Sequence, residues 1–543
     1  MKRVALVYVT PDDVVHVLAP ISSYIIHNHP LENPHRQNLY EHYFRLAKLS
    51  DCGETPHFVQ MKSEMASEDA NMEAILLHAL ENSYSRDAVK AIDHYTWFLI
   101  AHIPHTNLIF RAIETAEQRG YLDLQADCLF AKATIDYFRD DFKQATQGFD
   151  LASQLYAGQG NTRQEARCLL RLGDTHRLQS RLPEGRSRLL EAMSKFKEIN
   201  DTRGIAACLR SLGDILRMEN RYNEAHSHLM EAKSKFEEID YTPGTAQCLQ
   251  LLGATYLMQN HFKDAWEHLM EAKNQFEAIG ATRGIADSLK NMGNVLRLQC
   301  RYPEAREHLE DAKSKFERIG EVLGTAQCLR SLGDIFRVES CYKEAISHVE
   351  EAMKKFEEIG NTHGIAQCLR SLGEIHRAEG RPEEARDLLK KGQLKFEDTG
   401  STLGSAKCLQ SLGDILREEG NLVEARALLE QAKNKFQSIL DIRGAARCLQ
   451  RLGSILHSEN RYIEARLCFE EAKIKFGEIN DTSGVALCLF LSGQALRMEG
   501  MYDEARVHFE RAQEVYEREN DVHGVECCRN CIQVCKASLV QLV

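Results

Sequence analysis

The chain repeats itself at an interval of 40 residues, and this period restricts its fold more than any other feature. Glycine marks the interval most clearly, at positions 204, 244, 284, 324, 364, 404, 444, 484 and 524. Further series keep the same spacing, such as Gly173 to Gly493 and Ala225 to Ala505. One unit of this length cannot bury its apolar face alone, so the stacked copies predict a solenoid.

Each unit predicts two helices. In residues 204–219, apolar residues recur at helical spacing and form one face, and a second helix is expected from Tyr222 to about Ile239. The loop between units reads GATRG at 280–284. Its first glycine suits a left-handed helix end, and its threonine suits the N-cap of the next helix. Glycine inside the first helix costs about 1 kcal/mol against alanine, so we expect Gly213 to face Ala225 where the two helices approach closely.

The pattern within one unit resembles the tetratricopeptide repeat. The residues that carry the resemblance are Leu209, Leu212, Gly213, Leu216, Tyr222, Ala225, Leu229 and Ala232. The period of that family is about 34 residues, so this chain is similar to the longer repeats of kinesin light chains and G-protein polarity adaptors. The resemblance implies an all-α fold, a right-handed superhelical α-solenoid, and a non-enzymatic scaffold for protein–protein interactions. It covers residues 121–520 as ten repeats, and residues 521–543 are expected to form a capping helix.

Residues 1–120 do not follow the period. They predict a short strand at Val4–Val9 and helices at about 38–49, 72–80 and 88–100, and hence a mostly helical N-terminal module. The segments 18–30 and 39–47 resemble the winged-helix region that joins an ATPase to its repeats in fungal STAND-type proteins. That family implies an upstream NTPase, but GxxxxGK[ST] is absent from the sequence, so no nucleotide-binding residue and no cofactor is assigned.

Charge and composition disfavour several classes of partner. The formal net charge is −12 and the pI about 6.0, which argues against non-specific nucleic-acid binding. No apolar run reaches the ~20 residues of a membrane helix, so neither a membrane nor a nucleic acid is expected as a partner, and the cytoplasm is the expected location. We expect the cysteines that recur every 40 residues to be small buried residues, because equivalent atoms of stacked helices lie ~8–10 Å apart. A zinc site at Cys527, Cys528, Cys531 and Cys535 is disfavoured, because three of these residues share one helical face.

Charged residues of the first helices, off the apolar face, are expected to line a concave groove. In the unit 201–240 these are Arg210, Asp214 and Arg217. The same three positions in other units are occupied by Arg177, Arg297, Arg330, Asp334, Arg337, Arg370, Glu374, Arg377, Asp414, Arg417 and Arg497.

Two interpretations of these positions remain open. The guanidinium groups could bind an extended or helical peptide of acidic character, or the Asp–Arg pairs could only rigidify the groove. The first interpretation predicts that Arg337→Glu with Arg377→Glu abolishes partner binding and leaves melting unchanged.

The unit 241–280 interrupts the charged positions with Gln250, Tyr256, Leu257 and Trp266. These residues could form an anchoring pocket for a partner side chain, or they could be sequence drift in one unit. The function expected from the whole chain is a peptide-binding scaffold. The alternative is the repeat sensor of a STAND-type signalling NTPase whose ATPase part is missing or supplied by another chain.

Overall fold

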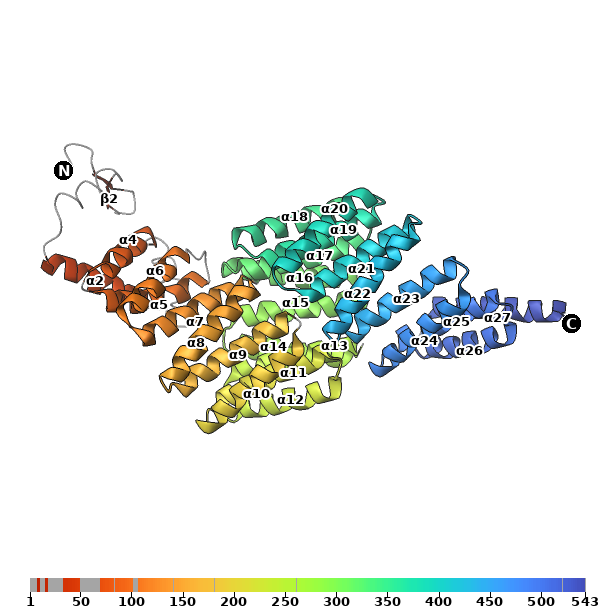
Figure 1. Ribbon diagram of the computed structural model, residues 1–543, viewed down its shortest axis with the longest axis horizontal. Coiled ribbons are helices and arrows are strands. Elements are labelled where there is room, and N and C mark those ends of the chain that lie inside the picture. Colours follow the sequence, from red (N-terminus) through yellow and green to blue (C-terminus); the bar gives the residue numbers. More distant parts are fainter. Residues whose placement is uncertain are drawn as a thin grey trace. The chain divides into compact units, whose positions relative to one another are not determined.

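The computed structural model is all-α apart from one short hairpin, and it confirms the predicted α-solenoid. It describes residues 7–9, 15–17, 33–48, 69–82, 84–100, 106–139, 141–179, 181–259, 261–519 and 521–542. The chain divides into two compact units (Figure 1). The first comprises Met1–Leu99 with His105–Cys128, and the second comprises Ile100–Pro104 with Leu129–Val543. The predicted domain limits at residues 120 and 520 stay a prediction.

The first unit contains a two-stranded hairpin and a group of helices. Strand β1 (Val7–Val9) pairs antiparallel with β2 (Val15–Val17). The helices are α2 (Asn33–Lys48), α4 (Asp69–Leu80), α5 (Ser85–Ile100) and α6 (Thr106–Arg119). The three predicted helices are therefore confirmed to within a few residues, whereas α6 was missed. Residues 18–30 lie outside the described residues.

Tyrosines fill much of the core of the first unit. Tyr40 and Tyr95 are both 1% exposed and belong to one apolar cluster that also contains Leu76 and Ile92. The buried Tyr40 hydroxyl lies 2.6 Å from Nδ1 of His78, so its polar end has a partner inside the core. The unit therefore has an apolar core of its own.

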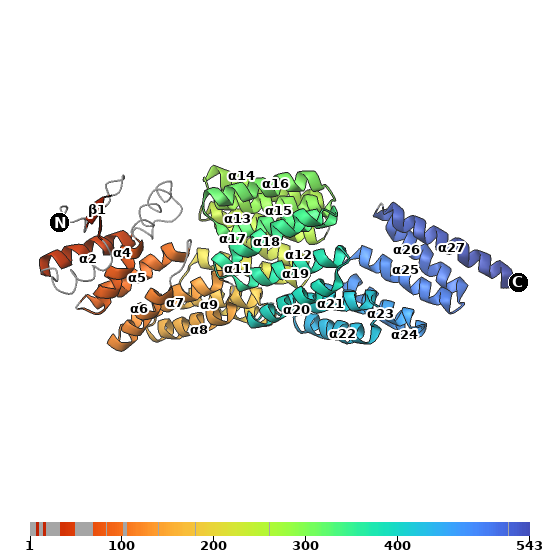
Figure 2. The same cartoon turned by 90° about the horizontal axis from the view of Figure 1, so that it is seen from above.

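The array consists of helix pairs in which odd-numbered helices come first and even-numbered helices second. Its helices are α7 (Leu122–Phe138), α8 (Phe142–Gly158), α9 (Thr162–Leu178), α10 (Leu182–Glu198), α11 (Thr202–Met218), α12 (Tyr222–Glu237), α13 (Thr242–Met258), α14 (Phe262–Ala278), α15 (Thr282–Leu298), α16 (Tyr302–Arg318), α17 (Val322–Val338), α18 (Tyr342–Glu358), α19 (Thr362–Ala378), α20 (Pro382–Asp398), α21 (Thr402–Glu418), α22 (Leu422–Ser438), α23 (Ile442–Ser458), α24 (Tyr462–Glu478), α25 (Thr482–Met498), α26 (Tyr502–Arg518) and α27 (Val522–Leu542). Successive pairs lie side by side in both views (Figure 2).

Helix ends follow simple backbone chemistry. Gly280 ends α14 with φ 68°, as expected, and Asn200 and Asn220 take the same left-handed conformation elsewhere. The prediction of threonine as the N-cap is wrong. In α11 the cap is Asp201, whose side chain accepts the backbone N–H of Gly204 at 2.9 Å, and Thr202 is the first helical residue. Asp and Asn compete well for the cap position because their short side chains reach the free N–H groups of the first turn.

Both glycine series make room for a large apolar side chain. A Cβ on Gly213 would lie 2.7 Å from Cγ of Leu229 and 3.4 Å from the carbonyl oxygen of Ala225. The main neighbour is therefore Leu229, one turn beyond the alanine that the sequence suggested. A Cβ on Gly244 would lie 2.6 Å from the ring of Phe236, which is 1% exposed. Each unit thus uses one glycine within the pair and one between pairs.

The cysteine series is a row of buried thiols, as predicted. The ten cysteines at the 40-residue interval are all buried, and none of them forms a disulfide: Cys128, Cys168, Cys208, Cys248, Cys328, Cys368, Cys408, Cys448, Cys488 and Cys528. Burial raises the pKa of the Cys248 thiol to about 12, so this sulfur stays protonated at neutral pH. Within the described ranges, no helix is both long enough and apolar enough to cross a bilayer.

The array curves back on itself, so that loops several repeats apart touch. The Phe142 ring meets the His363 ring edge-on at 5.9 Å. Arg443 Nη2 donates to the carbonyl oxygen of Met258 at 3.5 Å, across 185 residues of sequence, and the Arg443 side chain also hydrogen-bonds to Tyr222. We call these contacts the seam. It joins loops within helix pairs of the early repeats to loops between helix pairs of the later repeats.

Candidate functional site

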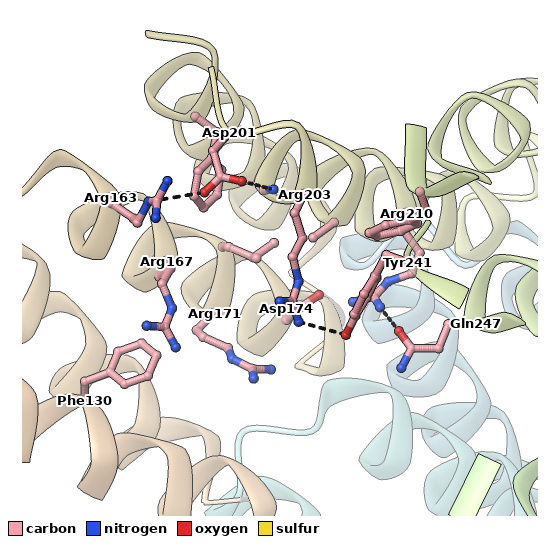
Figure 3. Close-up of a pocket in the computed structure, with 15 residues that line it drawn as sticks. Phe130, Arg163, Arg167, Arg171, Asp174, Asp201, Arg203, Arg210, Tyr241 and Gln247 are labelled. Atoms are coloured by element: carbon pink, nitrogen blue, oxygen red, sulfur yellow. Dashed lines mark hydrogen bonds and ion pairs between the residues drawn. The ribbon is translucent and has the colours of Figure 1, made fainter. Parts of the chain in front are cut away.

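A basic pocket lies on the first helices of three successive repeats, mainly α9, α11 and α13 (Figure 3). Its volume is about 570 Å³. Phe130, Leu170, Ala207, Gln247 and other side chains form parts of its wall. Its charged residues are five arginines and two aspartates: Arg163, Arg167, Arg171, Arg203, Arg210, Asp174 and Asp201. The surface formed by the first helices is called the groove below.

The repeat itself brings the arginines together. Arg163, Arg167 and Arg171 are spaced at i, i+4 and i+8, so they share one face of α9. Arg203 follows Arg163 by one period of 40, so α11 presents a guanidinium in the equivalent place beside α9. Arg210 lies two turns further along α11. Stacking two helices in register therefore concentrates positive charge in a chain that is acidic overall.

The two aspartates of the pocket already have partners. Asp201 accepts the N–H of Gly204 at 2.9 Å and lies 3.4 Å from Nε of Arg163. Asp174 is buried, and its carboxylate lies 3.6 Å from Nε of Arg177, which is outside the pocket. The remaining guanidinium groups therefore face each other without a matching number of carboxylates.

Aromatic rings and amides hold the arginines in place. The Arg203 guanidinium lies 4.1 Å from the ring centroid of Tyr241, and its Nη2 donates to the Tyr241 hydroxyl at 2.8 Å. Arg167 lies 5.2 Å from the ring of Phe130. Arg210 donates to the side-chain oxygen of Gln247. Such contacts orient the guanidinium planes without neutralising them, so their charge remains available to a ligand.

Crowding affects the charge state of the pocket in the expected direction. Burial lowers the pKa of Arg167, and the neighbouring charge of Arg171 lowers it further. An arginine stays protonated in spite of such a shift. Burial is the larger cause and the charge of Arg171 the second, and an anion bound between the arginines would offset this second effect.

Of the predicted groove residues, Arg210 lines this pocket, whereas its neighbours form ion pairs between repeats. Asp214 lies 2.6 Å from Arg177 of the preceding repeat and 2.6 Å from Arg217. Arg377 lies 3.0 Å from Glu374 and 2.8 Å from Glu418. Arg451 also pairs across repeats, with Asp414 at 2.7 Å, whereas Arg330–Asp334 at 3.5 Å and Arg417–Glu418 at 3.8 Å lie within single helices.

One expectation about these residues is corrected. Asp214 and Asp414 were expected to be exposed, but both are buried, because adjacent first helices cover them and an arginine of another repeat pairs with each. The expectation that Arg337→Glu with Arg377→Glu leaves melting unchanged stays a prediction. The structure argues against it, because Arg377 lies between Glu374 and Glu418 and a glutamate there would bring three carboxylates together.

The remaining predicted positions stay on the groove. They are half-buried on the first helices α15, α17, α19 and α25: Arg297, Arg337, Arg370 and Arg497. Their role in binding a peptide stays a prediction.

The residues that interrupt the charged positions in the unit 241–280 contact other side chains of the protein. Tyr256, Leu257 and Trp266 pack against a cluster that contains the buried Met292 and Val295. Gln250 Nε2 donates to the Ser288 hydroxyl at 2.9 Å. The anchoring pocket predicted for these residues therefore stays a prediction. In the described part of the chain, no group of three or more His, Cys, Asp or Glu side chains could hold a metal ion.

Four pocket residues were not predicted from the sequence: Arg163, Arg167, Arg171 and Arg203. The predicted positions are those that carry charge in most repeats, whereas these four arginines lie in only two repeats. The signal that could have identified them is the i, i+4, i+8 spacing of arginine on one helix, combined with a fourth arginine one period later.

Comparison with known proteins identifies the repeat. A family model described as tetratricopeptide repeat matches residues 164–238, 284–339, 332–392 and 405–473, so these segments carry tetratricopeptide repeats. No curated protein matches the chain. Relation to STAND-type NTPases, kinesin light chains or polarity adaptors stays a prediction.

Several solved structures are similar in part. A Rap protein complexed with competence and sporulation factor is 17% identical with a TM-score of 0.43, and the match covers 68% of this chain and 98% of that chain. BtubC from P. vanneervenii is 16% identical with a TM-score of 0.37, and the match covers 40% of this chain and 91% of that chain. Aspartyl phosphate phosphatase F from Bacillus subtilis is 13% identical with a TM-score of 0.39, covering 75% and 95%.

Proposed function

We propose that this chain is a non-enzymatic scaffold that binds a peptide segment of a partner protein in its groove, with acidic side chains of that segment in the arginine pocket. The observation that carries the proposal is the charge of the pocket. Five arginines line it, against two aspartates that are already paired or capping a helix.

The chemistry of the pocket suits carboxylates. A guanidinium offers a planar fork of N–H donors that matches the two oxygens of a carboxylate. The pocket spans three repeats, so several acidic side chains of one extended segment can bind along it. Because the whole chain carries a net charge of −12, a local basic surface also orients an acidic partner during its approach.

Fluorescence anisotropy of a labelled polyglutamate peptide with the full chain tests the proposal. We expect saturable binding that weakens as salt is raised, and no binding of a polylysine peptide. Arg167→Gln with Arg171→Gln removes two charges from the pocket. A charge-assisted hydrogen bond is worth about 1.5–3 kcal/mol, so the double variant is expected to bind at least about tenfold more weakly.

The matched control is Arg318→Gln with Arg511→Gln. Both arginines are exposed on second helices, so the variant loses the same charge away from the groove. Its affinity for the peptide is expected to match that of the unchanged protein. Equal loss in the two double variants would show a general charge effect and refute the pocket. Absence of saturable binding by the unchanged chain would refute the acidic peptide.

A further inference from the structure

Residues 37 positions apart meet where neighbouring first helices stack in the groove. Arg177 Nη1 donates to Asp214 at 2.6 Å, and Arg210 donates to Gln247. Lys290 Nζ donates to the side-chain oxygen of Gln327 at 2.8 Å, and also to Asp287 at 2.7 Å. A cation on one helix thus receives an oxygen acceptor from the next.

One pair in this register breaks the pattern. Glutamine occupies the acceptor position at 247, 327 and 367, but residue 407 is lysine. Arg370 on α19 is therefore followed by Lys407 on α21, so a cation meets a cation. Like charges in contact oppose each other, and a sequence tolerates such a pair at a cost.

The surroundings of Lys407 add more positive charge. Arg447 follows it by one period on α23, and Arg330 on α17 precedes Arg370 by one period. Both lower the pKa of Lys407, and the carboxylate of Asp441 acts in the opposite direction. That carboxylate already accepts the N–H of Gly444 at 2.9 Å as the N-cap of α23.

None of the three cations of this cluster forms a direct ion pair in the described part of the chain, although the carboxylate of Glu374 acts on Arg370 and those of Asp441 and Asp481 act on Arg447. Within the described ranges, the structure records no ion pair and no side-chain hydrogen bond for Arg370, Lys407 or the Arg447 guanidinium. Lys407 and Arg447 are exposed, and Arg370 is half-buried. His363, on the first turn of α19, also lies within reach of the Lys407 charge, and its ring is neutral at pH 7. The cluster is therefore open to solvent, and the carboxylates that act on it already have other partners, since Glu374 pairs with Arg377, Asp481 pairs with Arg443 and Asp441 caps α23.

The charge state of Lys407 reflects this crowding. The pKa of Lys407 is lowered to about 8. Desolvation by the surrounding protein is the larger cause, although the side chain keeps an exposed surface, and the charge of Arg370 is the second cause. An anion placed among these cations would offset the charge of Arg370 and so raise that pKa.

We propose that Arg370, Lys407 and Arg447 form a second anion site in the groove, which binds a phosphorylated side chain of the peptide held there. The peptide part of this inference rests on the proposed function. A phosphate monoester fits better than a carboxylate, because it carries nearly two negative charges at neutral pH and three acceptor oxygens for donors from three successive helices.

The test uses the full chain and phenyl phosphate, a phosphate monoester that needs no peptide. Acylation of lysine amines at pH 8 is followed residue by residue by mass spectrometry. Phenyl phosphate at millimolar concentration is expected to cover Lys407 and to raise its pKa, so that a larger fraction of the amine is protonated at pH 8. Its acylation should therefore slow by at least about threefold. Lys290 serves as the internal control, because Asp287 and Gln327 already bind its ammonium group, and its rate should not change.

A variant of Lys407 distinguishes binding at this site from a general effect of the protein's charge. Lys407→Gln introduces the residue that the chain itself uses at positions 247, 327 and 367, so packing is expected to be retained. Loss of one charge-assisted contact is expected to weaken phenyl phosphate binding, measured by calorimetry, by about tenfold or more. Lys290→Gln is the matched control and should bind as the unchanged protein does.

Each result bears on the proposal. Unchanged acylation of Lys407, or equal affinity of Lys407→Gln, would overturn the site. Equal protection by acetate would overturn its assignment to phosphate. Arg167→Gln with Arg171→Gln should leave the phenyl phosphate effect intact, so the second site can hold even if the first pocket fails. A phosphoserine peptide that binds no better than its unphosphorylated form would overturn the peptide source.

Discussion

Replacement of Asp214 by alanine is expected to loosen the contact between two repeats. Asp214 lies on α11, at the stacking surface with α9, 2.6 Å from Arg177 and 2.6 Å from Arg217. The side chains of the two arginines are 16% and 19% exposed, so the variant leaves two partly buried guanidinium groups without their carboxylate.

The expected cost follows from that geometry. Removal of one partner of a buried ion pair costs about 3–5 kcal/mol, because the other charge stays buried and unpaired. Arg177 keeps a second carboxylate, Asp174, at 3.6 Å, so the lower end of this range, about 3 kcal/mol, is expected. Asp311 is the control. It pairs with Lys315 at 2.7 Å with its side chain 47% exposed, so Asp311→Ala should cost at most about 0.5 kcal/mol.

The loss should be local, because each repeat of a solenoid contacts mainly its neighbours. Hydrogen exchange of the full chain is the appropriate assay. Amides of α9 to α12 are expected to exchange faster in Asp214→Ala, whereas those of α24 to α26 should not change. If Asp214→Ala and Asp311→Ala gave equal exchange in α9 to α12, the reasoning about the buried pair would be refuted.

The pH dependence has a defined sign. Burial alone would raise the pKa of Asp214, but Arg217 and Arg177 outweigh it and hold the pKa below its usual value. The carboxylate therefore contributes stability above the unfolded pKa of about 3.9, and this contribution is lost as pH falls through the folded value. The difference between Asp214→Ala and the unchanged protein should be constant from pH 5 to 7 and shrink only below about pH 4.

Three further expectations concern packing and reactivity. Gly244→Ala should destabilise the array by about 1–2 kcal/mol in urea unfolding, because overpacking against the buried Phe236 ring outweighs the gain in helix propensity. The control Gly477→Ala has open space around the new methyl group and should be neutral or stabilising, and the reverse order of the two variants would contradict the packing. Iodoacetamide at pH 8 should modify the exposed Cys300 and Cys341 well before the buried cysteine series, as read by mass spectrometry, and early labelling of the series would contradict its burial. Burial lowers the pKa of His363 to about 4, so the seam should be fully stable above pH 6.5 and weaken as pH falls from 6.5 toward 4. Hydrogen exchange of amides 360–364, corrected for the intrinsic effect of pH on exchange, should become faster over this range, and an unchanged protection would contradict the prediction.

The sequence predicted the array well because one pattern is repeated many times. The helix pair of residues 204–219 and 222–239 is observed as Thr202–Met218 and Tyr222–Glu237. Repetition averages out local ambiguity, so a period and an apolar face suffice to identify the helices. The first unit has no such redundancy, and α6 was missed there.

The site was predicted less completely, because the position of a residue on its own helix does not determine which residue of the adjacent helix it contacts. Asp214 lies off the apolar face of α11, which suggested exposure, yet Arg177 of the preceding repeat covers it. The contact register of 37 residues between first helices is a property of stacking, and the period of 40 alone does not reveal it. Arg210 was identified, whereas Arg167 and Arg171 were not, because their importance comes from the repeats on either side.

The seam has a consequence for how such a chain can change in evolution. An open row of repeats can gain or lose a unit by recombination, because only neighbours need to match. Here Phe142 must still meet His363, and Arg443 must still reach Met258. An inserted or deleted copy between these positions would shift every later loop by one unit and set the wrong side chains against each other. The seam therefore fixes the copy number of the intervening repeats, and lineages that retain it should vary their length only at the ends of the array.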